Sequence, residues 1–267
     1  MVPKDNLARE WDEATSSWAD FVREGKDHFR NEMNSPATFK IIGNVKNKDV
    51  LDLSCGEGYN SRILAKKGAR VVGVDFSTEM IKYAKQTEKT DRLGIKYHVA
   101  DAADLKMLKN QSFDIVTSFM ALMDIERYED AISEVARVLK RKGRFVFTIT
   151  HPCFDYGDTT KGEPIAEWKG EDTREKEASH LEVYRYFGIM KSDVPWNMKR
   201  LVKPFKTTSF HRTLTDYSEA LRANGFVISR LFEPKPTSRG VAKYPALKKH
   251  LKIPHSIIIE AIRNNSY

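Results

Sequence analysis

Short apolar runs and amphipathic stretches alternate along residues 45–150 of this 267-residue chain. The apolar runs predict strands at residues 49–53, 70–74, 95–99, 113–118 and 144–150. The amphipathic stretches predict helices at residues 59–67, 78–89 and 128–139, each expected to close on a following glycine. Strands joined by helices of this length predict a parallel sheet with right-handed crossovers and helices on both faces.

Two other regions lack this alternation. Residues 1–42 have an amphipathic helical pattern, which places Trp11 and Trp18 on one face. Residues 151–211 are polar and aromatic without a sustained period, which is typical of a substrate lid. A helix near 214–221 and strands at 226–232 and 256–262 continue the core pattern. We therefore expect an N-terminal helical cap (1–42), a cofactor-binding core (43–150 and 212–267) and a lid insertion (151–211).

The composition, with 40% hydrophobic and 31% charged residues, is typical of a globular protein. A net charge of +8 raises the question of an anionic partner, but the basic residues are spread along the chain, as on a solvated surface. No apolar run approaches the roughly 20 residues that span a bilayer, and the first residues lack a secretory signal, so we expect a cytoplasmic protein. Cys55 and Cys153 are too few for a disulfide framework or a zinc site, and we expect no metal.

The predicted sheet indicates where a ligand binds. In open parallel sheets, ligands lie beyond the carboxyl ends of the strands, where the strand order reverses. This rule places residues 54–58, Asp75, Asp101, residues 118–124 and His151 along one edge. We expect these scattered residues to form one site.

Residues 52–58 (DLSCGEG) lead from the first predicted strand into a helix. Their glycines let the backbone approach a ligand, and the start of the helix offers unpaired N–H donors. Asp75 ends the second strand 19 residues after Gly56, where a carboxylate can accept both hydroxyls of a ribose. An NAD-dependent enzyme is the nearest rival, but Ser61 stands where a dinucleotide motif needs its third glycine.

On these residues the chain resembles the class I S-adenosylmethionine-dependent methyltransferases of the small-molecule type. The resemblance covers about residues 45–150, and Asp52, Ser54, Gly56 and Gly58 occupy the family's first motif, with Ser54 in place of its first glycine. It implies a Rossmann-like α/β fold, with a seven-stranded, mostly parallel sheet of order 3-2-1-4-5-7-6 and an antiparallel last strand. It also implies S-adenosylmethionine as the cofactor and S-adenosylhomocysteine as the product.

The same resemblance implies the cofactor contacts. The motif glycines would pass under the methionine moiety, Asp75 would hold the ribose and Asp101 the adenine amine. Phe76 and Ala102 would flank the adenine, and residues 118–119 would face the transferred methyl group. The complete expected set is Asp52, Ser54, Gly56, Gly58, Asp75, Phe76, Met80, Asp101, Ala102, Ser118 and Phe119.

The acceptor side of the site carries weaker signals. His151 ends the fifth strand and is a candidate base, although a histidine before a proline can also hold the turn. The aromatic lid suits an apolar or planar acceptor, and Arg23, Arg30 and Arg212 could meet an acid. The candidate substrate contacts are Trp18, Arg23, Tyr184 and Arg212. The acceptor atom stays open between nitrogen, oxygen, sulfur and carbon.

Two alternatives to a small-molecule methyltransferase remain. One is an RNA or other nucleic-acid methyltransferase, and the other is a cofactor-binding protein without catalysis. Pro152-Cys153 resembles the pair of the cytosine-5 enzymes, but it follows the fifth strand rather than the fourth. We expect in-line transfer of a methyl group to a small molecule, with no nucleic-acid or membrane partner, by a monomer or homodimer.

Overall fold

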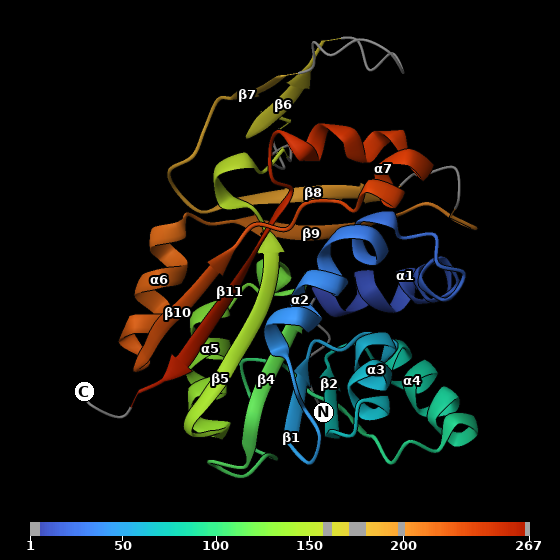
Figure 1. The fold of residues 1–267 in the computed structure, drawn as a ribbon, viewed down its shortest axis with the longest axis vertical. Coiled ribbons are helices and arrows are strands. Elements are labelled where there is room, and N and C mark those ends of the chain that lie inside the picture. The colour runs from blue at the N-terminus through green and yellow to red at the C-terminus, as the bar shows by residue number, and fades with distance from the viewer. Residues whose placement is uncertain (1–5, 157–161, 171–179, 197–200, 265–267) are drawn as a thin grey trace.

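A seven-stranded sheet forms the centre of the computed structural model, which describes residues 6–156, 162–170, 180–196 and 201–264 (Figure 1). Its strand order is β10-β11-β5-β4-β1-β2-β3, and β11 runs in the direction opposite to the other six strands of that sheet. Because β10 and β11 are the sixth and seventh core strands, the predicted order 3-2-1-4-5-7-6 is confirmed. The strands are β1 (Asp49–Leu53), β2 (Arg70–Asp75), β3 (Lys96–Val99), β4 (Phe113–Phe119), β5 (Leu139–Thr150), β10 (Phe226–Phe232) and β11 (Ser256–Arg263).

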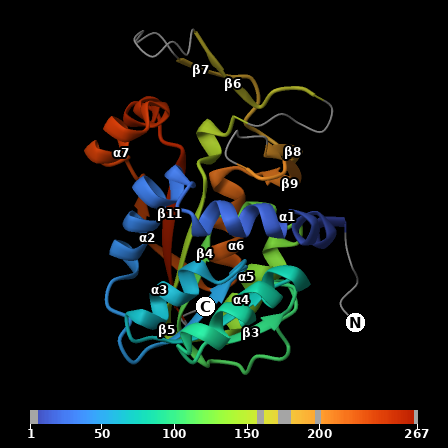
Figure 2. The same ribbon diagram turned by 90° about the vertical axis from the view of Figure 1, so that its right-hand side faces the viewer.

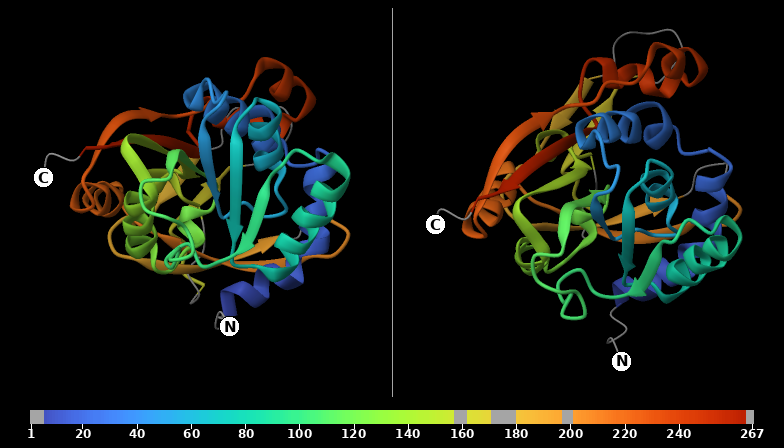
Figure 3. Two further views of the ribbon diagram at one scale, coloured as in Figure 1. Left: turned by 90° about the horizontal axis from the view of Figure 1, so that it is seen from below. Right: turned by 60° about the horizontal axis from the view of Figure 1, so that its bottom comes forward.

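Helices cover both faces of this sheet, as predicted. Buried side chains of α5 and α6 pack on one face, and those of α2, α3 and α4 pack on the other (Figure 3). No described helix has the length and apolar character needed to cross a bilayer. The helices are α1 (Asn6–Arg23), α2 (Ser35–Ile42), α3 (Tyr59–Lys66), α4 (Thr78–Asp91), α5 (Tyr128–Val138), α6 (Leu214–Ala223) and α7 (Ser238–Lys243), with short helical turns at Arg30–Asn34, Leu122–Asp124, Pro152–Phe154 and Pro245–Leu251.

The apolar stripe of α5 is buried along its whole length, from Tyr128 to Val138. Burial of one such aliphatic side chain contributes about 1.5–3 kcal/mol, so the stripe fixes the helix against the sheet. The prediction that a glycine closes this helix is wrong. The chain turns extended at Leu139, which pairs with Phe113 as the first residue of β5. Helix α4 also ends without glycine, on Arg92 in the left-handed conformation (φ 49°).

Residues 151–211, whose sequence shows no sustained period, contain two β-hairpins in their described part. One pairs β6 (Ala166–Lys169) with β7 (His180–Val183), and the other pairs β8 (Met190–Trp196) with β9 (Phe205–His211). The β8–β9 hairpin lies across the carboxyl ends of the core strands, and β6–β7 projects beyond it (Figure 1). Sequence periodicity missed these strands because a short two-stranded sheet does not require strict alternation of buried and exposed side chains.

Helix α1 lies between the β8–β9 hairpin and α4 (Figure 2). On the core side, Asp12 Oδ1 accepts hydrogen bonds from Ser77 Oγ (2.7 Å) and Glu79 N (3.1 Å). On the hairpin side, Glu10 accepts from the backbone N (2.8 Å) and hydroxyl (3.1 Å) of Thr208. The helix therefore joins the core to the hairpin over the same end of the sheet.

Candidate functional site

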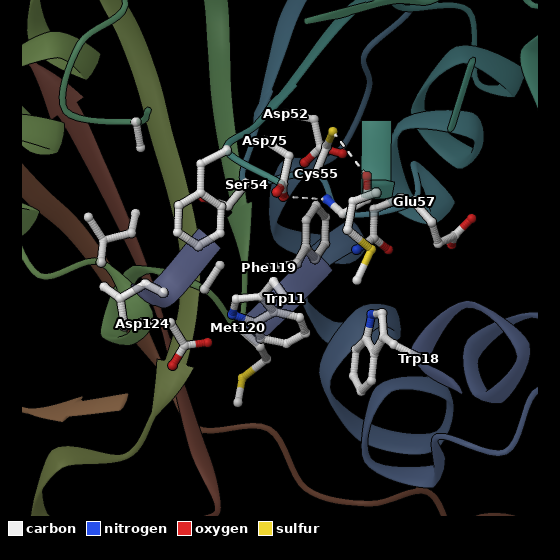
Figure 4. Close-up of a pocket in the computed structure, with 18 of the residues that line it drawn as sticks. Trp11, Trp18, Asp52, Ser54, Cys55, Glu57, Asp75, Phe119, Met120 and Asp124 are labelled. Atoms are coloured by element: carbon white, nitrogen blue, oxygen red, sulfur yellow. Dashed lines mark hydrogen bonds between the residues drawn. The ribbon is translucent and has the colours of Figure 1, made fainter. Parts of the chain in front are cut away.

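A cavity of about 220 Å³ opens beyond the carboxyl ends of β1, β2 and β4 (Figure 4). Most of the residues predicted to contact a cofactor lie in its wall, although they come from distant parts of the chain. Gly58 and Ser118 are exceptions, since neither is among the described residues that line it. The predicted residues in the wall are Trp18, Asp52, Ser54, Gly56, Asp75, Phe76, Met80, Asp101, Ala102 and Phe119.

The loop from β1 to α3 depends on left-handed backbone conformations. Ser54 and Gly56 both have φ of 55°, and Gly58 has φ of 84°. A Cβ atom on Gly56 would meet no heavy atom within 4 Å, so that glycine presents open backbone to the cavity. A Cβ atom on Gly58 would lie 2.4 Å from the Tyr97 hydroxyl. Gly58 is therefore required for packing behind the loop rather than for approach of a ligand.

Asp75 fastens this loop to the end of β2. Its Oδ2 accepts from Gly56 N (2.8 Å) and its Oδ1 from Ser77 N (2.9 Å). Burial raises the pKa of Asp75 to about 6, although both backbone hydrogen bonds favour the carboxylate. Each carboxylate oxygen keeps a further lone pair, so the group can still accept hydroxyl protons from a ligand in the cavity.

Asp52 lies deeper, at the end of β1, and is almost fully buried. It accepts hydrogen bonds from Ser61 Oγ (2.5 Å) and Thr117 Oγ1 (3.1 Å), which come from α3 and β4. Burial raises the pKa of Asp52 to about 6, against the effect of these two hydrogen bonds. Ser61, which stands where a dinucleotide motif needs a glycine, is thus a hydrogen-bond partner of Asp52.

Asp101 is anchored at the far end of the cavity. Its Oδ1 accepts from Ala103 N (2.8 Å), and its Oδ2 accepts from Arg127 Nη2 (2.5 Å). Arg127 also lines the cavity, a position that the sequence analysis missed. The two residues are 26 positions apart and on different elements, so no local sequence pattern links them.

Arg30 is a cation in the cavity wall. It lies in the π-helical turn Arg30–Asn34, with its guanidinium over the rings of Trp18 (5.4 Å) and Tyr59 (5.1 Å). Its Nε is 3.7 Å from Asp27 Oδ2. Its Nη1 is buried and has no hydrogen-bond partner among the described residues. A buried unpaired N–H group is costly, so this nitrogen is suited to an anionic or carbonyl oxygen of a ligand.

The predicted base, His151, lies outside the described walls of this cavity. It is 3% exposed, its Nε2 is 3.0 Å from Glu233 Oε1, and its Nδ1 accepts from Cys153 N (3.2 Å). Burial lowers the pKa of His151, while the hydrogen bond with Glu233 opposes that shift. These contacts are those of a residue that holds the turn after β5.

Three predicted substrate contacts are not in the described wall of the cavity, although Arg23 Nε lies 3.6 Å from Oε2 of the wall residue Glu57. Arg23 donates to Thr87 Oγ1 (2.8 Å), and Tyr184 donates to Glu182 Oε2 (2.7 Å) on an exposed hairpin. Arg212 is 2% exposed and donates to the Ile125 carbonyl (2.6 Å). It therefore braces the loop between β4 and α5. Of the four predicted substrate contacts, only Trp18 lines the cavity.

A second cavity, of about 620 Å³, adjoins the first. Aromatic rings from α1, the following turn and the β8–β9 hairpin form much of its wall, together with Tyr156 and His255. The residues that line both cavities are Trp11, Trp18, Arg30, Phe119, Met120 and Asp124. The two spaces therefore meet at the end of β4.

Comparison with known proteins agrees with this geometry. A family model for a methyltransferase domain matches residues 51–147. A protein of Haemophilus influenzae, described only as uncharacterized, is 28% identical over 207 residues, covering 76% of each chain. The ubiquinone biosynthesis O-methyltransferase of Coxiella burnetii is 32% identical over 156 residues. That match covers 57% of this chain and 64% of the enzyme, which is less than two thirds of its length.

Among solved structures, an S-adenosylmethionine-dependent methyltransferase from Mesorhizobium loti is similar over nearly its whole length. It superposes with a TM-score of 0.67 at 27% identity, covering 85% of this chain and 96% of that one. The loop from β1 to α3 and the acids that end β1 and β2 line one cavity. This cavity lies at the carboxyl ends of the strands, where a sheet of this order binds its ligand. The chain carries a class I S-adenosylmethionine-dependent methyltransferase domain, matched over residues 51–147, with S-adenosylmethionine as its cofactor.

Proposed function

We propose that this protein transfers the methyl group of S-adenosylmethionine to a small molecule bound in the second cavity. The observation that carries the proposal is the wall shared by the two cavities, which includes Phe119, Met120 and Asp124. Methyl transfer from a sulfonium is an in-line displacement, so the donor and acceptor must approach each other directly. Two adjoining cavities with a common wall satisfy this requirement.

The residues of the first cavity are suited to the cofactor. Asp75 would accept the ribose hydroxyls, and Asp101 would face the adenine amine. At the other end, Arg30 Nη1 and Glu57 Oε1 are both buried without a partner among the described residues, while Glu57 Oε2 pairs with Arg62 (2.8 Å) and Arg23 (3.6 Å). A zwitterionic methionine moiety would satisfy this pair of opposite charges. Gly56, whose backbone is open to the cavity, would pass beneath it.

The second cavity supports a small acceptor. Its volume suits a molecule of metabolite size, and its aromatic walls suit an apolar or planar group. The similarity to an enzyme named as a ubiquinone biosynthesis O-methyltransferase is consistent with this assignment. We further propose that residues 1–42 act as a cap and residues 151–211 as a lid, because α1 and the β8–β9 hairpin supply much of this wall.

Cofactor binding is tested first, by calorimetry with S-adenosylhomocysteine. We expect micromolar affinity, about −8 kcal/mol, weakened at least about tenfold by Asp75→Ala. The matched control is Asp91→Ala, an exposed aspartate at the end of α4 outside the described cavity wall, which should change nothing. Equal affinity of all three proteins would contradict the proposed site.

The acceptor is then sought by incubating the protein with S-adenosylmethionine and pooled cell metabolites. Mass spectrometry should detect a product heavier by one methyl group that is absent with Asp75→Ala. Total RNA is tested in parallel, because a nucleic-acid acceptor is the main alternative. Methylation of RNA, with RNA affinity that falls steeply with salt, would replace the small-molecule assignment.

A further inference from the structure

We propose that the acceptor is an amine, held as its ammonium ion by the Asp124 carboxylate against the tryptophan walls of the second cavity, and that Asp124 removes the proton that frees the nitrogen for methylation. This inference rests on the proposed function of the second cavity. It adds an acceptor class and a catalytic residue that the sequence analysis did not assign.

Asp124 stands where the two cavities meet. It ends the short helical turn Leu122–Asp124, which follows β4 directly, and it lines both spaces. Figure 4 shows it on the side of the cavity away from Asp52 and Asp75, near Met120. A group in this position can touch an acceptor while the acceptor faces the cofactor.

The surroundings of Asp124 leave its carboxylate available to a cation. Ser209, on β9 and also in the wall of the second cavity, hydrogen-bonds to it. The charges that act on it are the cation Arg212 and the acids Asp155 and Glu10. Burial is the largest influence and raises the pKa of Asp124 to about 7. A carboxylate with this pKa can both bind an ammonium ion and accept its proton near neutral pH.

The nearby charges of Asp124 already have partners of their own. Arg212 donates to the carbonyls of Ile125 (2.6 Å) and Glu126 (3.1 Å) and lies over the Tyr128 ring at 4.1 Å. Asp155 Oδ2 is 3.3 Å from His211 Nδ1, on the strand that carries Ser209. Glu10 accepts two hydrogen bonds from Thr208. The guanidinium that acts on Asp124 is therefore also engaged with two backbone carbonyls and an aromatic ring.

Tryptophan rings form the wall of the same space. The Trp18 ring lies 5.8 Å from the Trp11 ring and 5.1 Å from the Trp196 ring, measured between centroids. Trp196 in turn stacks on Phe205 at 5.6 Å. The faces of aromatic rings attract ammonium ions, and this attraction strengthens where water is excluded. Aromatic rings beside a half-buried carboxylate favour a cation over an acidic or neutral acceptor.

The cations that line the second cavity do not offset this preference. Arg30 lines both cavities, but its guanidinium lies over Trp18 and Tyr59 and its charge acts on Asp52, on the cofactor side. Lys26 forms an ion pair with Glu24. An acceptor carboxylate at Asp124 would therefore meet a like charge, whereas an ammonium would meet an opposite one.

The proposed step balances as follows. The Asp124 carboxylate takes one proton from the ammonium and leaves a neutral amine. The nitrogen lone pair forms the new N–C bond to the methyl carbon that S-adenosylmethionine supplies, and the S–C bond electrons return to sulfur as S-adenosylhomocysteine. The positive charge moves from sulfur to the methylated nitrogen, and the proton on Asp124 passes to solvent.

Two probes of equal shape test the proposal by binding, without the natural acceptor. Phenethylamine and phenethyl alcohol are titrated into the protein saturated with S-adenosylhomocysteine, at pH 8 and pH 6. At pH 8 we expect the amine to bind at least about tenfold more tightly than the alcohol. At pH 6 this preference should fall about tenfold, because only about one tenth of Asp124 then remains ionised. Equal binding of the two probes at pH 8 would overturn the proposal.

Two isosteric variants locate the effect. Asp124→Asn should abolish the amine preference while phenethyl alcohol still binds. Asp155→Asn, at another carboxylate in the wall of the second cavity, should retain most of the preference. An amine preference that survives in Asp124→Asn would contradict the proposed role of Asp124. If that variant does not fold, the change of the amine preference between pH 8 and pH 6 in the wild type tests the role instead. Failure of wild type to bind S-adenosylhomocysteine at all would instead contradict the proposed function.

Discussion

Substitution of Gly58 by alanine should destabilise the protein through a contact that the motif itself does not reveal. Gly58 is the N-cap of α3 and has φ of 84°. A Cβ atom there would lie 2.4 Å from the hydroxyl oxygen and 2.8 Å from Cζ of Tyr97, on β3. Tyr97 is 4% exposed and belongs to the core on that face of the sheet, so its ring has little room to move.

The expected cost has two parts. An L-residue in the left-handed region costs about 1–2 kcal/mol, and forcing a methyl group into a packed core costs about 1–3 kcal/mol. Gly58→Ala should therefore lower the free energy of unfolding by about 2–5 kcal/mol. Gly94→Ala is the matched control, because Gly94 has φ of 79° but a Cβ atom there would meet nothing within 4 Å. It should cost about 1–2 kcal/mol from the backbone alone.

Urea denaturation of the three proteins measures both parts, provided that the transitions keep the same slope. The double variant Gly58→Ala/Tyr97→Ala should be less destabilised than the sum of its two single variants, because the ring that clashes is gone. If Gly58→Ala and Gly94→Ala cost the same, or if the two substitutions at 58 and 97 are additive, the steric argument is refuted.

Four further predictions follow from the site. Arg30→Ala should weaken S-adenosylhomocysteine binding about tenfold or more in calorimetry. The affinity for methylthioadenosine, which lacks the amino-acid moiety, should not change. Equal losses for both ligands would exclude a contact between Arg30 and the cofactor carboxylate. Asp52→Asn should gain stability relative to wild type by about 1–2 kcal/mol more at pH 8 than at pH 5. Folding raises the pKa of Asp52 from 3.8 to about 6, so the wild type loses stability as the pH rises from the lower value through the higher one, and at pH 5 only part of that loss has occurred. Urea curves that give the same difference at the two pH values would contradict this. Cys55 should react with iodoacetamide at pH 8 at least about tenfold more slowly in the folded protein than in urea. Burial and, to a smaller extent, the charges of neighbouring acids raise the pKa of its thiol. Equal rates, measured by peptide mapping, would refute this prediction. His151→Ala should leave turnover of the identified acceptor within about twofold of wild type, because His151 pairs with Glu233 outside the described cavity walls. A large loss of turnover with unchanged cofactor affinity would instead identify His151 as the base.

The sequence by itself determined the core fold and most of the cofactor edge. Periodicity located the seven core strands, because strands buried between helices are selected for continuous apolar character along the chain. The parallel arrangement then placed the strand ends, with Asp52, Asp75 and Asp101, at one edge, since this consequence of topology needs no knowledge of packing. Local pattern and general topology were sufficient for these features.

Only the tertiary structure decided the features that depend on contacts between distant segments. It separated Gly56, open to the cavity, from Gly58, which packs on Tyr97, although both occupy the same motif. It also moved His151 and Arg212 out of the site, because each is committed to neighbours far away in the sequence. The edge rule had already placed Asp124, within residues 118–124, at the carboxyl ends of the strands, but packing decided which side chains of α1 and the β8–β9 hairpin meet it there. Their meeting point depends on how these elements pack, and sequence spacing carries no information on that.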